Sequence, residues 1–343
     1  MPPLPKDDLE DIVKRTLDFW PKLKGQNIFI TGGTGFFGHW LVESFLEAND
    51  KLALGAKAYI LTRNINNVFE RSPHLSKRND LVWIEGDIAT FDFPEGIFPV
   101  VIHAATDTYD KGVKESPDNI FATIVDGTKR VLVFAKQAKT NTLLYVSSGA
   151  VYGPQPVDCL RLHEDMPVID ENDITNTPYA RGKVMAEKLC AQFAKETSIS
   201  IKIVRCFAFI GPLLPLHKHF AIGNFIRDAI INKNIEISGN GKSQRTYLYA
   251  SDLSVYLWTI ISKGCSIKPY NIGGGRIVNV FELAQSVIIA LNSLVTIDIQ
   301  SNHTSKQFSK YVPDVDLIKN ELGLTPEVTL EQAIVKTVLW SRL

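Results

Sequence analysis

The sequence of 343 residues predicts an α/β protein with a doubly wound parallel sheet and a smaller C-terminal lobe. Between residues 27 and 207, short apolar runs alternate with stretches that have the spacing of helices. The apolar runs are continuous, which is typical of strands buried on both faces of a parallel sheet. The chain is also long enough to form one large domain and a second lobe.

The predicted elements follow one another in a regular order. The predicted strands are short apolar runs at 27–31, 58–62, 81–86, 100–105, 142–148 and 201–207. The predicted helices cover 40–48, a stretch near 117–138, and 178 to about 196. After residue 209 the chain is rich in proline and its elements become shorter. We therefore predict a first domain over 1–208, to which 246–272 returns, and a smaller α/β lobe made of 209–245 and 273–343.

The charge balance argues against a polyanionic partner. Lys and Arg together number 37, Asp and Glu together also number 37, and no long run of one sign is present. Binding to nucleic acid or to a membrane surface therefore has no electrostatic support. The first 20 residues carry acids where a signal peptide needs an apolar core, and no apolar span of 18 residues follows.

The cysteines and histidines predict neither a disulfide framework nor a metal site. Cys159, Cys190, Cys206 and Cys265 are scattered without a CxxC pair. His217 and His219 form an HxH pair with no third ligand nearby in the sequence. We therefore expect a cytoplasmic protein that binds no metal.

The first predicted strand runs into TGGTGFFG, where Gly32, Gly35 and Gly38 are three residues apart. Glycine is needed where the chain turns tightly, where the backbone approaches a pyrophosphate, and where a helix packs closely on a strand. The N-terminus of the following helix would offer N–H groups and a positive dipole end to phosphates. The first domain is therefore predicted to be a dinucleotide-binding Rossmann domain.

A second motif, TPYARGK, lies at the start of the predicted helix 178–196. Thr177 can cap this helix and Pro178 suits its first turn. Tyr179 and Lys183 are four residues apart and share one helical face. A free tyrosine has a pKa of about 10, and a nearby ammonium group lowers that pKa toward the range useful in proton transfer.

TGGTGFFG, SSGAVYG (147–153) and YARGK (179–183) together resemble the extended short-chain dehydrogenase/reductase superfamily, whose members are NAD(P)-dependent epimerases, dehydratases and reductases of nucleotide sugars. The resemblance extends from about residue 20 to the C-terminus. It implies a catalytic triad in which Ser148 orients a sugar oxygen, Tyr179 exchanges a proton with it, and Lys183 holds the nicotinamide ribose. It also implies that the second lobe binds the nucleotide sugar.

The resemblance assigns further residues to the two ligands. The implied cofactor contacts are Gly32, Thr34, Gly35, Phe36, Phe37, Arg63, Asp87, Ile88, Ala104, Ala105, Tyr179, Lys183, Arg205 and Phe207. The implied substrate contacts are Thr108, Ser148, Gly149, Asn224, Arg245, Asn271 and Tyr311. The chain departs from the family pattern at Lys310, where members often have arginine, and at IVDGT (124–128). These departures weaken the assignment of the family's ligand contacts to those positions.

Two small residues after Ser148 restrict the reaction. Dehydratases of this superfamily have an Asp-Glu pair directly after the catalytic hydroxyl residue, and related decarboxylases keep the glutamate. This chain has Gly149 and Ala150 there. Dehydration and decarboxylation therefore lack their acidic residues. The reactions left are those that need only hydride transfer assisted by Tyr179, namely a 4-epimerisation or a net reduction of a 4-keto group.

The end of the second predicted strand favours reduction. Thr62 stands where NAD-binding members usually carry an acid, and Arg63 is well placed for the 2′-phosphate of NADP. The sequence most resembles dTDP-4-keto-6-deoxyglucose reductases, which form dTDP-fucose. We therefore expect an NADP(H)-dependent 4-ketoreductase of a nucleotide-linked 6-deoxysugar. A 4-epimerase with tightly bound NAD and a non-catalytic NADP-binding protein are the alternatives.

The resemblance also implies a homodimer, in which the helix near 117–138 and the helix bearing Tyr179 pair with their copies. The apolar residues expected to supply this interface are Val131, Leu132, Phe134, Leu189, Cys190 and Phe193.

Overall fold

The computed structural model describes residues 1–105, 117–217, 220–300 and 309–341. Its contacts divide the chain into two compact units. Unit 1 comprises residues 1–153, 167–205 and 254–270, and unit 2 comprises residues 154–166, 206–253 and 271–343.

A seven-stranded sheet with the order β11-β6-β5-β4-β1-β2-β3 forms the centre of the fold. Its strands are β1 (Asn27–Thr31), β2 (Lys57–Thr62), β3 (Leu81–Glu85), β4 (Val100–His103), β5 (Thr142–Ser148), β6 (Ser200–Cys206) and β11 (Pro269–Ile272). β1 pairs in parallel with β2 on one side and with β4 on the other. The strand order therefore reverses between β1 and β4, as in a Rossmann fold, and the predicted fold class is confirmed.

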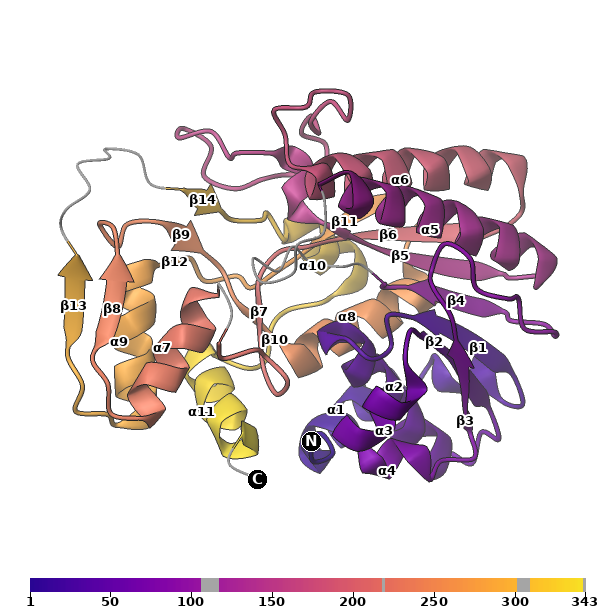
Figure 1. Ribbon diagram of the computed structural model, residues 1–343, viewed down its shortest axis with the longest axis horizontal. Helices are drawn as coiled ribbons and strands as arrows, with labels where there is room; N and C mark the ends of the chain where they lie inside the picture. Colours follow the sequence, from indigo (N-terminus) through magenta and orange to yellow (C-terminus); the bar gives the residue numbers. More distant parts are fainter. Residues whose placement is uncertain (106–116, 218–219, 301–308, 342–343) are drawn as a thin grey trace. The chain divides into compact units, whose positions relative to one another are not determined.

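The helices of unit 1 cover both faces of this sheet (Figure 1). They are α1 (Lys6–Arg15), η1 (Trp20–Leu23), α2 (Phe36–Lys51), α3 (Ile65–Arg71), α4 (Pro73–Ser76), α5 (Pro117–Gln137), η2 (Gly149–Tyr152), α6 (Pro178–Glu196) and α8 (Ala250–Lys263), of which residues 254–263 belong to this unit. α5 and α6 lie side by side over one face, whereas α2 and α8 lie on the other.

Aromatic side chains fill the core beneath α5 and α6. The ring of Phe29 on β1 lies 4.5 Å from that of Phe134 and 5.5 Å from that of Phe91. All three are buried, and burial of one such side chain stabilises the fold by about 1.5–3 kcal/mol. Phe134 belongs to this core together with Val131, Leu132 and Cys190. Because these four side chains are buried within their own chain, they do not form the dimer face expected of them.

On the opposite face, an indole cluster holds the N-terminal segment to the domain. The ring of Trp20 in η1 lies 4.8 Å from that of Trp258 in α8. The indole N–H of Trp258 donates to Ser44 Oγ on α2 at 2.9 Å. Trp20, Trp40 and Trp258 are fully buried. The segment before β1 is therefore part of the packed domain.

Two elements, α2 and β4, differ from the sequence prediction by more than one residue at a boundary. α2 begins at Phe36, four residues before the predicted start, because its N-cap Gly35 is extended with φ −82° and the glycine turn leads directly into the helix. β4 ends at His103, two residues before the predicted end.

Unit 2 contains four helices among its described residues: α7 (Ala221–Ile230), α9 (Val280–Leu291), α10 (Asp316–Leu322) and α11 (Leu330–Ser341). Its short strands are β7 (Phe209–Ile210), β8 (Ile235–Ser238), β9 (Gln244–Arg245), β10 (Leu248–Tyr249), β12 (Val278–Asn279), β13 (Ile297–Gln300) and β14 (Lys310–Tyr311). They pair as β12-β9-β14, β10-β7 and β13-β8. Asn279 and Glu282 form a capping box that fixes the start of α9.

The boundary between the units differs from the predicted domain division in four segments, of which 206–208 and 271–272 are short. Residues 154–166 belong to unit 2 because the Leu162 N–H donates to Val312 O at 2.9 Å and the Asp314 N–H donates to Leu162 O at 2.8 Å. Residues 246–253 also belong to unit 2, where β10 pairs with β7. Residues 254–270 belong to unit 1.

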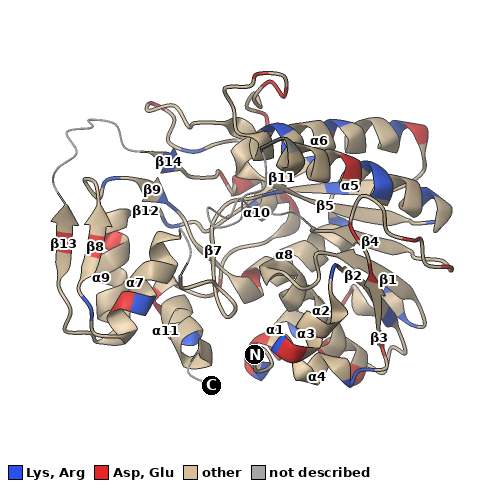
Figure 2. Ribbon diagram, in the orientation of Figure 1, with Lys and Arg blue, Asp and Glu red and all other residues tan. Residues whose placement is uncertain are grey.

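Figure 2 shows Lys and Arg interspersed with Asp and Glu along α1, α5 and α6. Across the part of the chain that the structure describes, no helix is both long and apolar enough to span a bilayer.

Candidate active site

The glycines of the turn after β1 lie so close to neighbouring backbone that a side chain would not fit, as in dinucleotide-binding turns. Gly32 has φ +72°, and a Cβ there would lie 2.6 Å from the carbonyl carbon of Ala104 and from the nitrogen of Ala105. A Cβ on Gly38 would lie 2.1 Å from Gly32 O, so only glycine lets α2 approach the strand. Gly35, the N-cap of α2, has no side chain to cap the first N–H groups. The turn thus fits a bound pyrophosphate.

A buried hydrogen-bond chain holds the ends of β1 and β4 together beside this turn. Thr31 Oγ1 lies 2.8 Å from His103 Nδ1, and His103 Nε2 lies 3.2 Å from Thr128 Oγ1 on α5. Thr128 donates its own proton to Ile124 O, so its oxygen accepts from His103 Nε2. Burial, reinforced by the charge of Lys183, lowers the pKa of His103 to about 3. The imidazole is therefore neutral. This role of His103 was not predicted from the sequence.

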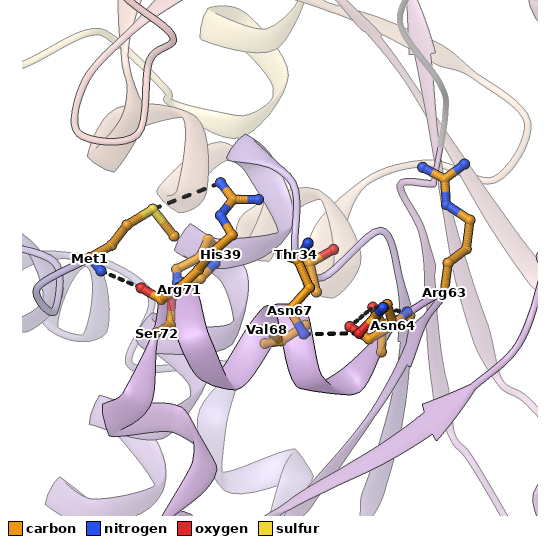
Figure 3. A pocket seen from close by; sticks show the side chains of 10 residues that line it. Met1, Thr34, His39, Arg63, Asn64, Asn67, Val68, Arg71 and Ser72 are labelled. Atoms are coloured by element: carbon orange, nitrogen blue, oxygen red, sulfur yellow. Dashed lines mark hydrogen bonds between the residues drawn. The ribbon is translucent and has the colours of Figure 1, made fainter. Parts of the chain in front are cut away.

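A pocket opens at the end of β2, where the predicted cofactor residues Thr34 and Arg63 lie (Figure 3). Arg63 and Arg71 lie at opposite ends of the pocket in this view. The lining residues are Met1, Thr34, His39, Thr62, Arg63, Asn64, Asn67, Val68, Arg71 and Ser72. None of these is Asp or Glu, so the described residues give the pocket positive side chains and no carboxylate.

The other predicted cofactor residues of unit 1 have different environments. Asp87 is exposed, and its carboxylate accepts the N–H of Ala89 at 2.8 Å. Ile88 is buried against α5, where a Cβ on Gly127 would lie 2.8 Å from it. Phe36 and Phe37 are half-buried at the start of α2, with their rings 5.7 Å apart. Contact of these residues with a cofactor stays a prediction.

The three predicted catalytic residues lie at the end of β5 and the start of α6. Ser148 ends β5, and its Oγ accepts the N–H of Ala150 at 3.2 Å. Thr177 caps α6 as predicted, with Pro178 in the first turn. Lys183 Nζ donates to Val146 O on β5 at 2.7 Å and lies 5.8 Å from the centroid of the Tyr179 ring. The structure thus brings Lys183 close both to Tyr179 and to the strand that ends in Ser148.

A buried ion pair between Arg205 and Glu187 lies beside these residues. The sequence analysis did not predict this pair. Arg205 donates to Glu187 Oε2 at 2.7 Å and to the Tyr152 hydroxyl at 2.8 Å. Ser147 donates to Glu187 Oε1 at 2.5 Å. The sequence signal was available, because Glu187 follows Lys183 by four residues on the same helical face. These contacts give Arg205, a predicted cofactor residue, an observed partner within the protein.

The contacts of Glu187 show whether its carboxylate can replace the acid that this chain lacks after Ser148. Gly149 and Ala150 form the first residues of η2 and bring no carboxylate. Glu187 is held by the Arg205 guanidinium and by Ser147, which together occupy both of its carboxylate oxygens. Glu187 therefore stabilises the fold around the site and is a poor candidate for proton transfer.

In unit 2, Arg245 and Tyr311 are neighbours on paired strands. β9 and β14 place the two residues directly opposite each other, and the guanidinium lies 5.8 Å from the centroid of the Tyr311 ring. Arg245 donates to Gln244 O and to both oxygens of Ser309. Among the described residues no carboxylate forms an ion pair with it, and burial lowers its pKa. A guanidinium surrounded by neutral groups suits an anionic ligand.

The remaining predicted residues of unit 2 have partners within the protein. Phe207, predicted at the cofactor, belongs to this unit, and its ring lies 4.6 Å from that of Tyr311. Asn271 is fully buried and its amide donates to Leu162 O at 2.8 Å. Asn224, on α7, accepts from Arg227 at 3.3 Å. Their ligand contacts stay predictions, and Thr108 lies outside the described residues.

Comparison with known proteins identifies the family. The family model "NAD dependent epimerase/dehydratase family" matches residues 28–273. A dTDP-glucose 4,6-dehydratase from Streptomyces niveus is 24% identical over 320 residues, 92% of this chain and 92% of that protein. UDP-glucuronic acid decarboxylase 2 from Arabidopsis thaliana is 25% identical over 319 residues, 91% of this chain and 67% of that protein.

A solved structure shows the same fold. The UDP-glucuronic acid 4-epimerase from Bacillus cereus, in complex with UDP-glucuronic acid and NAD, superposes with a TM-score of 0.76 at 19% identity. The match covers 92% of this chain and 99% of that one. The family model spans most of the chain, and the chain therefore belongs to the NAD dependent epimerase/dehydratase family.

Proposed function

We propose that this protein is an NADPH-dependent 4-ketoreductase of a nucleotide-linked 6-deoxysugar, such as dTDP-4-dehydro-6-deoxyglucose. The observation that carries the proposal is the pocket at the end of β2, which contains Arg63 and Arg71 and has no carboxylate among its described lining residues. A carboxylate there would accept hydrogen bonds from the ribose hydroxyls of NAD, whereas arginine favours the 2′-phosphate of NADP. An enzyme that consumes NADPH carries out a net reduction.

The residues at the end of β5 fit proton transfer to a carbonyl oxygen. The nicotinamide, when bound, supplies the hydride. Tyr179 donates a proton to the sugar oxygen, and Ser148 orients that oxygen by a hydrogen bond. Lys183, anchored to Val146 O, provides a positive charge near the Tyr179 ring, as the proposed proton transfer requires.

The same site lacks the groups that two related reactions need. Elimination of water requires an acid and a base beyond the catalytic hydroxyl, and this chain has Gly149 and Ala150 at those positions. The nearby carboxylate of Glu187 is held by Arg205 and Ser147. We therefore do not assign dehydration or decarboxylation to this chain, although some of its relatives are named for those reactions.

We assign the nucleotide sugar to unit 2. Among the described residues, the hydrogen-bond partners of Arg245 are all neutral. Its guanidinium can therefore bind the pyrophosphate through charge-assisted hydrogen bonds. Tyr311 lies against this guanidinium. Asn224, Asn271 and Thr108 remain further candidates, with Ser148 and Gly149 at the sugar.

A 4-epimerase with resident NAD is the second candidate. It needs the same tyrosine and no additional acid, and a protein of this fold is a 4-epimerase. The two functions differ in whether cofactor is consumed.

The deciding experiment incubates the purified protein with NADPH and, in separate reactions, dTDP-, UDP-, GDP- and CDP-linked 4-keto-6-deoxysugars. We expect stoichiometric oxidation of NADPH with one of them, and NMR should identify the 4-hydroxy product. The Tyr179→Phe variant serves as the inactive control. If the protein carries non-exchanging NAD and interconverts 4-epimers without consuming NADPH, the epimerase assignment replaces the reductase.

A further inference from the structure

Two histidines and a glutamate converge in unit 1 at a place that the sequence did not mark as a metal site. His39 and Glu43 are one turn apart on α2, and His74 lies in α4. His39 Nε2 is 3.5 Å from Glu43 Oε1, and His74 Nε2 is 3.2 Å from the same oxygen. One ligand atom from each residue lies within 4.8 Å of the other two.

These separations are close to those of a tetrahedral metal site. Bonds of about 2.0–2.1 Å to zinc place neighbouring ligand atoms about 3.3 Å apart in a tetrahedron. The two distances to Glu43 Oε1 already have this length. The two imidazole nitrogens lie within 4.8 Å of each other. His74 is the more exposed of the two histidines, with 25% of its side chain accessible, so a small rotation of that ring can close the site.

The surroundings support the three side chains as ligands. His39 and Glu43 are buried, which excludes most competing water. The second carboxylate oxygen, Glu43 Oε2, accepts the N–H of Leu4 at 2.8 Å. Such an outer contact holds a ligating carboxylate in orientation. His39 and Ser72 line the pocket of Figure 3, and Ser72 Oγ lies 3.3 Å from His39 Nε2. A fourth ligand, water or this hydroxyl, can therefore reach the open side.

We propose that His39, Glu43 and His74 bind one divalent transition-metal ion, with Zn²⁺ the best match to a site of two imidazoles and one carboxylate. The positive charges of Arg71 and of the Met1 ammonium oppose a bound cation and limit its affinity. The competing explanation is a metal-free cluster in which both imidazoles donate to Glu43 and hold the segment containing Leu4. The proposal does not depend on the proposed reaction.

The test measures zinc binding by the full chain. The protein is stripped with a chelator, dialysed against micromolar ZnCl₂, and analysed for bound zinc by mass spectrometry of the metal. We expect one equivalent in the wild type. His74→Gln and Glu43→Gln should each weaken binding by about 100-fold or more, since even outer-shell substitutions cost about 10–100-fold. His163→Gln, which replaces a histidine with 57% of its side chain exposed, should leave binding unchanged.

Co²⁺ supplies a second readout that a structural effect of the substitutions would not produce. A tetrahedral site gives intense visible absorption on Co²⁺ addition, and this band should be lost in His74→Gln while circular dichroism shows that the variant remains folded. A wild type that binds no zinc overturns the proposal. Variants that bind as much zinc as the wild type also overturn it and favour the metal-free cluster.

Discussion

Cofactor preference depends on the chemistry of very few side chains at the end of β2. NADP differs from NAD by one phosphate on the adenine ribose. The lining residues that the structure describes give the pocket containing Arg63 positive charge and no carboxylate. An arginine–phosphate hydrogen bond contributes about 1.5–3 kcal/mol. At about 1.4 kcal/mol per decade, this contribution corresponds to roughly one to two orders of magnitude in affinity.

The Arg63→Ala variant should therefore bind NADPH about 10–100-fold more weakly and bind NADH almost as well as the wild type. Solvent screening at this open pocket shifts the effect toward the lower value. Fluorescence titration with both cofactors at moderate salt measures the ratio. Lys57→Ala, at the opposite end of the same strand, is the matched control and should change neither affinity. Equal affinity of the wild type for NADH and NADPH would refute the cofactor assignment.

Tyr179 should determine turnover and not binding. Loss of a positioned general acid costs about 10²–10⁴-fold in rate. Tyr179→Phe should therefore lower kcat by that factor and leave the Kd for NADPH close to that of the wild type. Steady-state assays on the nucleotide 4-keto-sugar, together with a cofactor titration, separate the two effects. Turnover within a few fold of the wild type would remove Tyr179 from the mechanism.

On the scale of elements, α6 carries both the proposed catalytic residues Tyr179 and Lys183 and Glu187 of the buried ion pair. Tyr179, Lys183 and Glu187 follow one another at intervals of four residues. Lys183 reaches β5 through Val146 O, and Glu187 reaches β5 through Ser147 and β6 through Arg205. The helix is therefore fixed against both strands within two turns of Tyr179.

Breaking this ion pair on one side should destabilise the protein strongly. Glu187→Gln leaves Arg205 buried without its counter-ion, which costs about 3–5 kcal/mol of unfolding free energy. Replacing both partners by Glu187→Gln with Arg205→Met should cost less than the sum of the single variants. Urea unfolding of the three variants measures this. Lys129→Gln, at an exposed ion pair on α5, is the control with an expected effect below about 1 kcal/mol. Strict additivity would show that the pair is not coupled.

On the scale of the whole molecule, the sequence was informative where structure is local. Continuous apolar runs predicted the strands. Thr177 and Pro178 predicted how α6 begins, and the three glycines predicted a tight turn after β1, because caps and turns depend on adjacent residues; the start of α2 was predicted four residues too late. The contacts that join distant segments could not be predicted in this way. Ser147 and Glu187 are 40 residues apart, and Leu162 pairs with backbone about 150 residues further along. Apolar residues on α5 were assigned to a dimer face because periodicity shows which face is apolar but not what covers it.

Stability should fall in acid in part because of His103. Its pKa is about 3 in the folded chain and 6.5 as the reference value. Below pH 6.5 the unfolded state therefore binds a proton that the folded state does not, and stability is lost as the pH falls toward 3. Between pH 6.5 and pH 5, this single group should cost up to about 2 kcal/mol.

Urea unfolding of the wild type and of His103→Gln at pH 7 and pH 5 tests this. The variant lacks the titrating ring, so the difference in its stability between the two pH values should be smaller by up to about 2 kcal/mol. Identical pH dependence in the two proteins would assign the acid sensitivity to other groups.

The homodimer stays a prediction for the whole molecule, with an interface other than the buried residues of α5. Val133, with 49% of its surface exposed, is an apolar residue on this helix that a partner can reach. Light scattering at micromolar concentration should give twice the mass of 38.3 kDa, and Val133→Glu should reduce it if α5 takes part. A monomer mass for the wild type would exclude the dimer.

The indole cluster around Trp258 gives the domain an intrinsic optical probe. Three of the five tryptophans are fully buried, and two of them, Trp20 and Trp258, meet where the segment before β1 joins the domain. An indole emits at longer wavelength when water reaches it. Detachment of that segment should therefore shift the emission of Trp258 to the red before the sheet itself unfolds. Comparing tryptophan emission with circular dichroism during a urea titration would show whether the two events occur at different urea concentrations.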